Sequence, residues 1–156
     1  MTNVNAIKLG LLALAIAIAF LFQTDHVFSD TNNRGEAADL DVGEQLYAEN
    51  CASCHGADLE GQPEWRSRGP DGKLPAPPHD RTGHTWHHGD ALLFNYTKLG
   101  GTEVMKLQGI DFDSGMPGFG EVLSDSEIQS ILSFIKSTWP ERERRVQAER
   151  TNAEQQ

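Results

Sequence analysis

Apolar residues gather at the start of the chain in an unbroken run from Leu9 to Phe22, preceded by the single base Lys8. This pattern predicts that residues 1–23 are either a membrane anchor or a signal peptide. An anchor needs about 20 apolar residues, so the run is short for one. The cleavage pattern A-x-A is also missing, with "VFSD" at 27–30 as a weak substitute. We favour the anchor, and both interpretations place the rest of the chain outside the cytoplasm.

Helical spacing of apolar residues returns after residues 24–39, which are polar and predict a linker. Asp41 and Glu44 have the spacing of a capping box, so we expect a helix that begins at Asp41 and runs into Cys51. Its apolar face would consist of Val42, Leu46 and Tyr47.

Two further helices are predicted by the same periodicity. One lies within residues 89–101, where Gly100 provides a stop signal. Its apolar stripe would contain Leu92, Leu93, Tyr96 and Leu99. The other begins after Ser124, with Glu127 three residues later as the second half of a capping box, and ends at Trp139. Its apolar face would contain Ile128, Ile131, Leu132 and Ile135.

The segments between these helices are rich in glycine and proline and predict loops, above all residues 57–86 and 109–122. A loop as long as 57–86 is unusual in a compact domain, unless it covers something large that is not protein. The charged tail, 141–156, has no apolar face and predicts a frayed helix or disorder. With no convincing strand, the expected fold class is all-α, with one compact domain over 40–140.

The net charge of the chain limits its choice of partners. Without Lys8, 12 basic residues stand against 23 acidic ones, a net charge of −11. Nucleic acid is therefore excluded as a partner. A basic docking surface on another protein is compatible with this charge, and so is an acidic surface that only aids solubility.

The only two cysteines, Cys51 and Cys54, are three residues apart and are followed directly by His55 in "CASCH". A disulfide, half of a zinc site and a covalently attached haem all use such a pair. A disulfide across two intervening residues closes a very small loop and gains little chain entropy. Neither it nor a zinc site requires the adjacent histidine, whereas C-x-x-C-H is the pattern of covalent haem attachment. We therefore predict two thioether bonds, with the His55 imidazole beneath the ring.

A second axial ligand is suggested by Met116, which lies in "SGMPGFG" about sixty residues after the cysteines. A methionine that fills a gap in a core usually lies on an apolar helix face, as Met105 would. One held between glycines and followed by proline is better placed to offer its thioether to a metal ion.

With these motifs the chain resembles the class I cytochromes c, the family with one haem and His/Met ligation, over about residues 39–139. The resemblance implies a small helical domain wrapped around one covalent haem c, here preceded by an N-terminal hydrophobic helix. Cys51 and Cys54 match the thioether cysteines, His55 the proximal ligand, and Met116 in "MPGFG" the distal ligand.

The resemblance also implies contacts around the haem. Gly43 and Tyr47 match a glycine and an aromatic residue of the first helix, which pack on the last helix; Ile131 and Phe134 would meet them there. A proline carbonyl should accept a hydrogen bond from the proximal imidazole. The possible prolines are Pro75, Pro77 and Pro78, and the residues that could lie near a haem propionate are Trp86 and Arg81.

A one-electron carrier is the function these features predict, in an exported chain on the periplasmic side. The protein would lie at the cell membrane, or free in the periplasm if residues 1–23 are cleaved. It would not be an enzyme, because two protein ligands leave no open position on the iron. Redox partner proteins are implied, without their identities.

Two other functions remain open at this point. A haem-based sensor would release Met116 and bind a gas or respond to redox state. A zinc site could combine His84 and His88 with Cys51 and Cys54. A metal-handling accessory would use the histidines of "HDRTGHTWHH". These histidines are His79, His84, His87 and His88.

Overall fold

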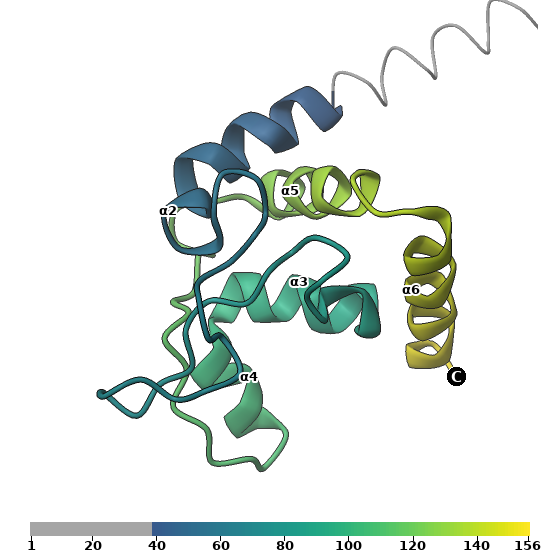
Figure 1. The fold of residues 1–156 in the computed structure, drawn as a ribbon. Coiled ribbons are helices and arrows are strands. Elements are labelled where there is room, and N and C mark those ends of the chain that lie inside the picture. Colours follow the sequence, from purple (N-terminus) through teal and green to yellow (C-terminus); the bar gives the residue numbers. More distant parts are fainter. Residues whose placement is uncertain (1–38) are drawn as a thin grey trace, which may run out of the picture. The chain divides into compact units, whose positions relative to one another are not determined.

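The computed structural model describes residues 39–156, and every regular element within that range is helical (Figure 1). This confirms the all-α prediction for the described part of the chain. The predicted anchor or signal peptide, 1–23, and residues 24–38 of the linker lie outside the described residues. No helix within 39–156 is long and apolar enough to cross a membrane.

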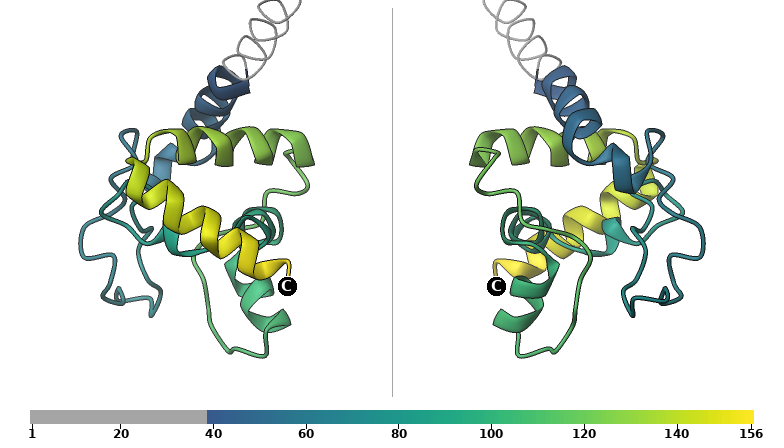
Figure 2. Two further views of the ribbon diagram at one scale, coloured as in Figure 1. Left: turned by 90° about the vertical axis from the view of Figure 1, so that its right-hand side faces the viewer. Right: turned by 90° about the vertical axis from the view of Figure 1, so that its left-hand side faces the viewer.

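The described elements follow one another with long loops between some of them (Figures 1 and 2). They are the helical residues 39–50, α2 (Ala52–His55), the 3₁₀ turn η1 (Thr85–His87), α3 (Asp90–Leu99), α4 (Gly101–Leu107), α5 (Asp125–Ser137) and α6 (Glu141–Glu154). Apart from η1, residues 57–86 contain no regular element, as predicted.

The helical segment 39–50 crosses α5 at close range. A Cβ atom on Gly43 would overlap the carbonyl oxygen of Ser130, so only glycine allows the two backbones to approach this closely. Tyr47 packs on Phe134 with ring centroids 5.6 Å apart, and Ile131 is buried in the same core. The predicted packing of the first helix on the last helix of the matched region is confirmed.

Only one of the two predicted capping boxes marks the start of a helix. Ser124 and Glu127 form the predicted box at the start of α5: the Glu127 amide donates to Ser124 Oγ at 3.3 Å and the Ser124 amide to Glu127 Oε2 at 2.7 Å. Asp41, by contrast, does not begin its helix, since residues 39 and 40 are already helical. Asp39 is tied to α5 instead, where the Ser130 hydroxyl donates to its carboxylate.

The stop predicted at Gly100 is real, but the chain continues into α4, whose bounds were not predicted from periodicity, although Met105 was expected on a helix. Gly100 adopts a left-handed conformation with φ 85°. A side chain there would collide with the backbone of Pro117 and Gly118. The break between α3 and α4 therefore provides the surface on which the Met116 loop lies.

The tail was predicted to be a frayed helix or disordered; it is helical, but it is neither frayed nor disordered. Residues Glu141–Glu154 form α6, a helix that packs on η1 and α3 (Figure 2). Its buried residues are polar, Glu143 and Gln147, so an apolar periodicity could not reveal it.

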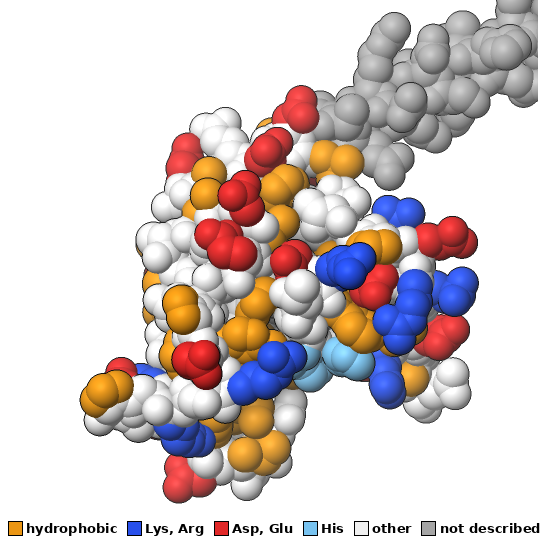
Figure 3. Space-filling view, in the orientation of Figure 1, with side chains coloured by type: hydrophobic (Ala, Val, Ile, Leu, Met, Phe, Trp, Pro, Cys, Tyr) orange, Lys and Arg blue, Asp and Glu red, His pale blue; other side chains and the backbone are white. Residues whose placement is uncertain are grey.

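Figure 3 shows acidic side chains gathered near the helical segment 39–50, whereas many Lys, Arg and His side chains of that face lie toward α6.

Candidate functional site

The Cys-x-x-Cys-His stretch forms a single turn at the end of the first helix. Cys51 follows the helical residues 39–50, and the His55 amide donates to the Cys51 carbonyl at 2.9 Å. Both cysteines are free thiols, Cys51 buried and Cys54 exposed. Burial, followed by the neighbouring Cys54, raises the pKa of the Cys51 thiol to about 11. The structure thus has no disulfide here.

His55 is held in one tautomer. Its Nδ1 lies 2.8 Å from the carbonyl oxygen of Pro77, and a carbonyl can only accept, so Nδ1 carries the proton. In a neutral imidazole this leaves Nε2 with a free lone pair, the form that binds a metal ion. Burial lowers the pKa of His55, partly offset by the bond to Pro77, and so favours the neutral ring. Of the three possible prolines, the structure selects Pro77.

The Pro77 carbonyl is placed by a closed loop. The Gly61 amide donates to the His55 carbonyl at 2.7 Å, and the Gln62 amide to the Ala76 carbonyl at 2.8 Å. Gly61 has a φ of 69°, and a Cβ there would collide with the backbone at Pro77 and Pro78. Two ends of a long irregular segment are thereby brought against the His55 turn.

Tyr47 supports the same turn from the core. Its hydroxyl donates to the Gly56 carbonyl at 2.9 Å. Burial, with smaller contributions from Cys51 and Glu60, raises the pKa of Tyr47 far above its usual range, so the phenol keeps the proton that it donates.

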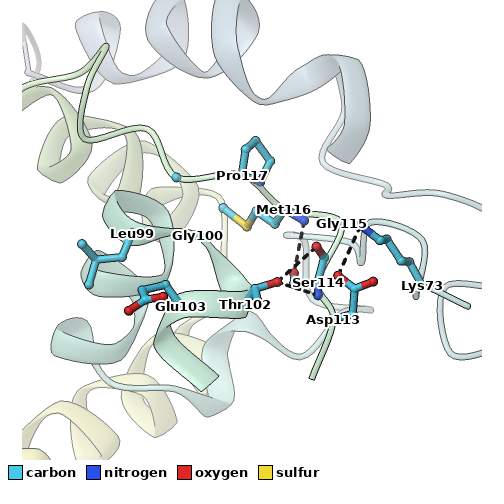
Figure 4. Close-up of a pocket in the computed structure, with 11 residues that line it drawn as sticks. Lys73, Leu99, Gly100, Thr102, Glu103, Asp113, Ser114, Gly115, Met116 and Pro117 are labelled. Carbon is cyan, nitrogen blue, oxygen red and sulfur yellow. Dashed lines mark hydrogen bonds and ion pairs between the residues drawn. The ribbon is translucent and has the colours of Figure 1, made fainter. Parts of the chain in front are cut away.

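Met116 lies in the loop that rests on the α3–α4 break. Its carbonyl accepts from the Gly101 amide at 3.1 Å, and its amide donates to Ser114 Oγ at 3.1 Å. Ser114 is fixed in turn by Thr102 of α4. Figure 4 shows Met116 with Ser114 and Thr102, and the pocket beside them, whose lining includes Leu99 and Glu103. The hydrogen bonds of this loop reach α3 and α4, and none of them reaches the Cys-x-x-Cys-His turn.

The histidines of the 79–88 stretch do not form one cluster. His84 stacks on Trp65, with centroids 5.3 Å apart, and meets His88 edge-on at 5.3 Å. His87 stacks on Trp86 at 3.7 Å, and His79 lies against His55. Within residues 39–156 no group of three or more His, Cys, Asp or Glu is arranged to hold a metal ion. The zinc set of His84 and His88 with the two cysteines is therefore not assembled among these residues.

Burial lowers the pKa values of both His84 and His88, and nearby positive charges lower them further. For His84 the contributing charges are His88, His87 and Arg66. For His88, His87 and Arg150 lower the pKa, whereas Glu154 raises it. Cationic neighbours also disfavour a bound metal cation at this pair.

The indole of Trp86, a residue expected near a haem propionate, is buried, and its Nε1 donates to the Arg81 carbonyl at 3.3 Å. A propionate role for Trp86 or Arg81 stays a prediction.

Paired thiols, an imidazole with a free Nε2 and a thioether in a fixed loop are the donor groups of a haem c protein, and the cytochrome c family model matches residues 40–139. The chain belongs to the cytochrome c family. A cytochrome c6 from Gracilaria tenuistipitata var. liui is 29% identical over 110 residues, which cover 70% of this chain and 82% of the relative. No solved structure matches the chain.

Membership makes the chain a class I c-type cytochrome with one covalently bound haem c. It is an electron-transfer protein rather than an enzyme. The residues of the structure fit that group, since two free thiols and a lone pair on a buried imidazole lie within one turn. Sequence reasoning named His79 only as a possible metal ligand and did not predict that its ring lies against that of His55.

Proposed function

We propose that the chain carries single electrons in an exported electron-transfer chain, with haem c attached through Cys51 and Cys54 and ligated by His55 and Met116. The haem supplies the one-electron couple of its iron. The hydrogen bond from His55 Nδ1 to the Pro77 carbonyl is the observation that carries the proposal. It leaves Nε2 as the nitrogen with a free lone pair, and it makes the imidazole a stronger donor.

Met116 is the proposed distal ligand. A thioether stabilises the ferrous state more than a second imidazole does and so raises the reduction potential. The backbone bonds of Met116 to Gly101 and Ser114 hold the loop in place. These bonds restrict the movement of the loop around Met116 when the charge of the iron changes.

The variant Met116→Ala tests this assignment, with Met105→Ala as the matched control in α4. We expect Met116→Ala to keep its haem, lose the sulfur-to-iron charge-transfer band of the ferric protein and have a lower reduction potential. Met105→Ala should match the native protein in both measurements. An unchanged band and potential in Met116→Ala would show that another residue is the distal ligand.

A gas sensor is the second proposal, and the glycine-rich surroundings of Met116 favour it only weakly, because both backbone polar groups of Met116 are tied down. Carbon monoxide separates the two functions. The reduced native protein should show no rapid spectral change at neutral pH if it is a carrier, whereas Met116→Ala should bind the gas. Rapid binding by the native protein would favour the sensor.

The organisation of the exported protein belongs to the same proposal. Residues 1–23 would anchor the chain or be cleaved, 24–38 would be a linker, and the haem domain on the periplasmic side would meet redox partner proteins. The N-terminal hydrophobic segment lies outside the described residues. A mass spectrum of the mature protein tests this organisation, since it gives both the first residue and the added mass of one haem.

A further inference from the structure

A second imidazole lies directly against the proposed proximal ligand. The rings of His55 and His79 are stacked, with centroids 4.0 Å apart and planes inclined by 21°. Tyr47 approaches the ring of His79 edge-on, at 6.2 Å. His79 therefore presents a flat face to one side of the His55 ring.

The ring of His79 is held by a hydrogen bond. Its Nδ1 lies 2.9 Å from the Thr85 hydroxyl, and that hydroxyl lies 3.5 Å from the Pro78 carbonyl. The carbonyl can only accept, so the hydroxyl donates to it and accepts from His79. One side of the ring is thus tied to the turn η1, which begins at Thr85.

The backbone of His79 is fixed at both polar groups. Its amide donates to the Leu59 carbonyl at 2.8 Å, and its carbonyl accepts from the indole Nε1 of Trp139 at 2.7 Å. Trp139 is 1% exposed and stands at the end of α5. Since backbone and ring are both tethered, the stacked face cannot easily move away from His55.

Packing alone does not explain a polar residue at this position. An imidazole enclosed among rings costs free energy unless its polar atoms are bonded, and a leucine or phenylalanine would fill the space without needing a partner. The bond to Pro77 fixes the rotation of the His55 ring only coarsely, since hydrogen bonds tolerate wide angles. A flat, tethered neighbour restricts the rotation that remains.

We propose that His79 is a positioning residue, which fixes the rotation of the His55 ring about its bond to iron by stacking on it while tethered to Thr85. This inference rests on the proposed function. The rotational angle of an axial imidazole sets how unpaired electron density is distributed over the porphyrin. The pattern of haem methyl resonances in the ferric protein therefore changes when that angle changes.

The test compares variants of the ferric holoprotein by proton NMR and electron paramagnetic resonance. His79→Leu removes the flat face and should displace the haem methyl pattern and broaden the paramagnetic resonance lines. His79→Phe keeps the face and should stay close to the native pattern. Thr85→Val removes only the tether and should displace the pattern in the same sense, by less. His87→Leu is the matched control, because His87 also stacks on an aromatic ring but not on His55.

A native methyl pattern in His79→Leu would overturn the proposal, and so would a displacement in His79→Phe as large as in His79→Leu. An equal displacement in His87→Leu would likewise overturn it. Should His79→Leu fail to fold, Thr85→Val decides: displacement supports the proposal and a native pattern overturns it. Failure of the proposed function is distinguishable, because the native protein itself would then lack the sulfur-to-iron charge-transfer band.

Discussion

Replacing Gln147 by leucine should loosen α6 from the rest of the domain. Gln147 is 5% exposed. Its side-chain amide lies 2.7 Å from Asp90 Oδ1, 3.0 Å from Thr151 Oγ1 and 3.4 Å from the His88 carbonyl. The two amide hydrogens can serve two of these acceptors at once. The variant removes these donors but leaves the Asp90 carboxylate in place.

The size of the effect follows from these bonds. A hydrogen bond to a charged group contributes about 1.5–3 kcal/mol, and a neutral one about 0.5–1.5 kcal/mol. Asp90 keeps its ion pair with Lys136 at 2.9 Å, and a buried leucine regains part of the loss. We therefore expect the free energy of unfolding to fall by about 2 kcal/mol. For a domain of this size that lowers the melting temperature by roughly 6–12 °C.

Urea unfolding of the ferric holoprotein, followed by circular dichroism, measures this difference. The control is Gln155→Leu, an exposed glutamine just beyond the end of α6, which should change the unfolding free energy by less than about 0.5 kcal/mol. The charge-transfer band of the folded variant should match the native one, because Gln147 touches no proposed ligand. A loss in Gln147→Leu no larger than in the control would refute the reasoning.

Two other perturbations have a defined sign. Gly43→Ala should destabilise the domain by about 1–3 kcal/mol in the same urea assay, since the added methyl group would push against Ser130 and Phe134 of α5; native-like stability would contradict the close crossing. His84 and His88 have folded pKa values below their usual 6.5, so stability should be full above pH 6.5 and fall as the pH drops below it. Replacing both by phenylalanine should reduce the fall of the urea midpoint between about pH 7 and pH 5 without abolishing it, because the buried His79 also has a lowered pKa; an unchanged slope would assign the whole loss to other groups.

Features that depend on neighbours in sequence could be predicted from it. The turn that gathers Cys51, Cys54 and His55 is local, and so is the capping box of Ser124 and Glu127, which the structure confirms. Periodicity also placed the buried face of α5 correctly. In each case the interacting residues are within a few positions of one another. Spacing alone is not sufficient, however, since Asp41 and Glu44 have the same spacing and Asp41 lies inside its helix.

The helix α6 could not be predicted because its partners are distant backbone groups. Thr151 Oγ1 accepts from the Asp90 amide at 3.0 Å, and Glu154 Oε2 from the Ala91 amide at 3.0 Å. The first amides of α3 have no partner within their own helix, so α6 supplies the missing acceptors. Periodicity detects apolar faces, whereas this contact is made by polar side chains.

The choice among three prolines depended on how a long loop closes. Pro75, Pro77 and Pro78 are chemically alike, and their order in the chain does not reveal which carbonyl faces His55. Closure is set by Gly61, whose left-handed backbone lets the prolines approach, and by the pairing of Gln62 with Ala76. The same closure brings His79 against His55. Neither the choice of Pro77 nor the contact of His79 with His55 could be predicted without the three-dimensional path of residues 57–86.

The two proposed ligands are therefore fixed in different ways, which bears on how the site can vary. His55 is part of the Cys-x-x-Cys-His turn, and it is held there by the hydrogen bond to the Pro77 carbonyl and by the stacked ring of His79. Met116 is held through a loop that lies on the glycine break between α3 and α4. Since these contacts share no residue, a change in the Met116 loop should alter the distal ligand without rotating the proximal imidazole. Substitutions on the distal side should therefore change the reduction potential of a related chain while its haem stays attached.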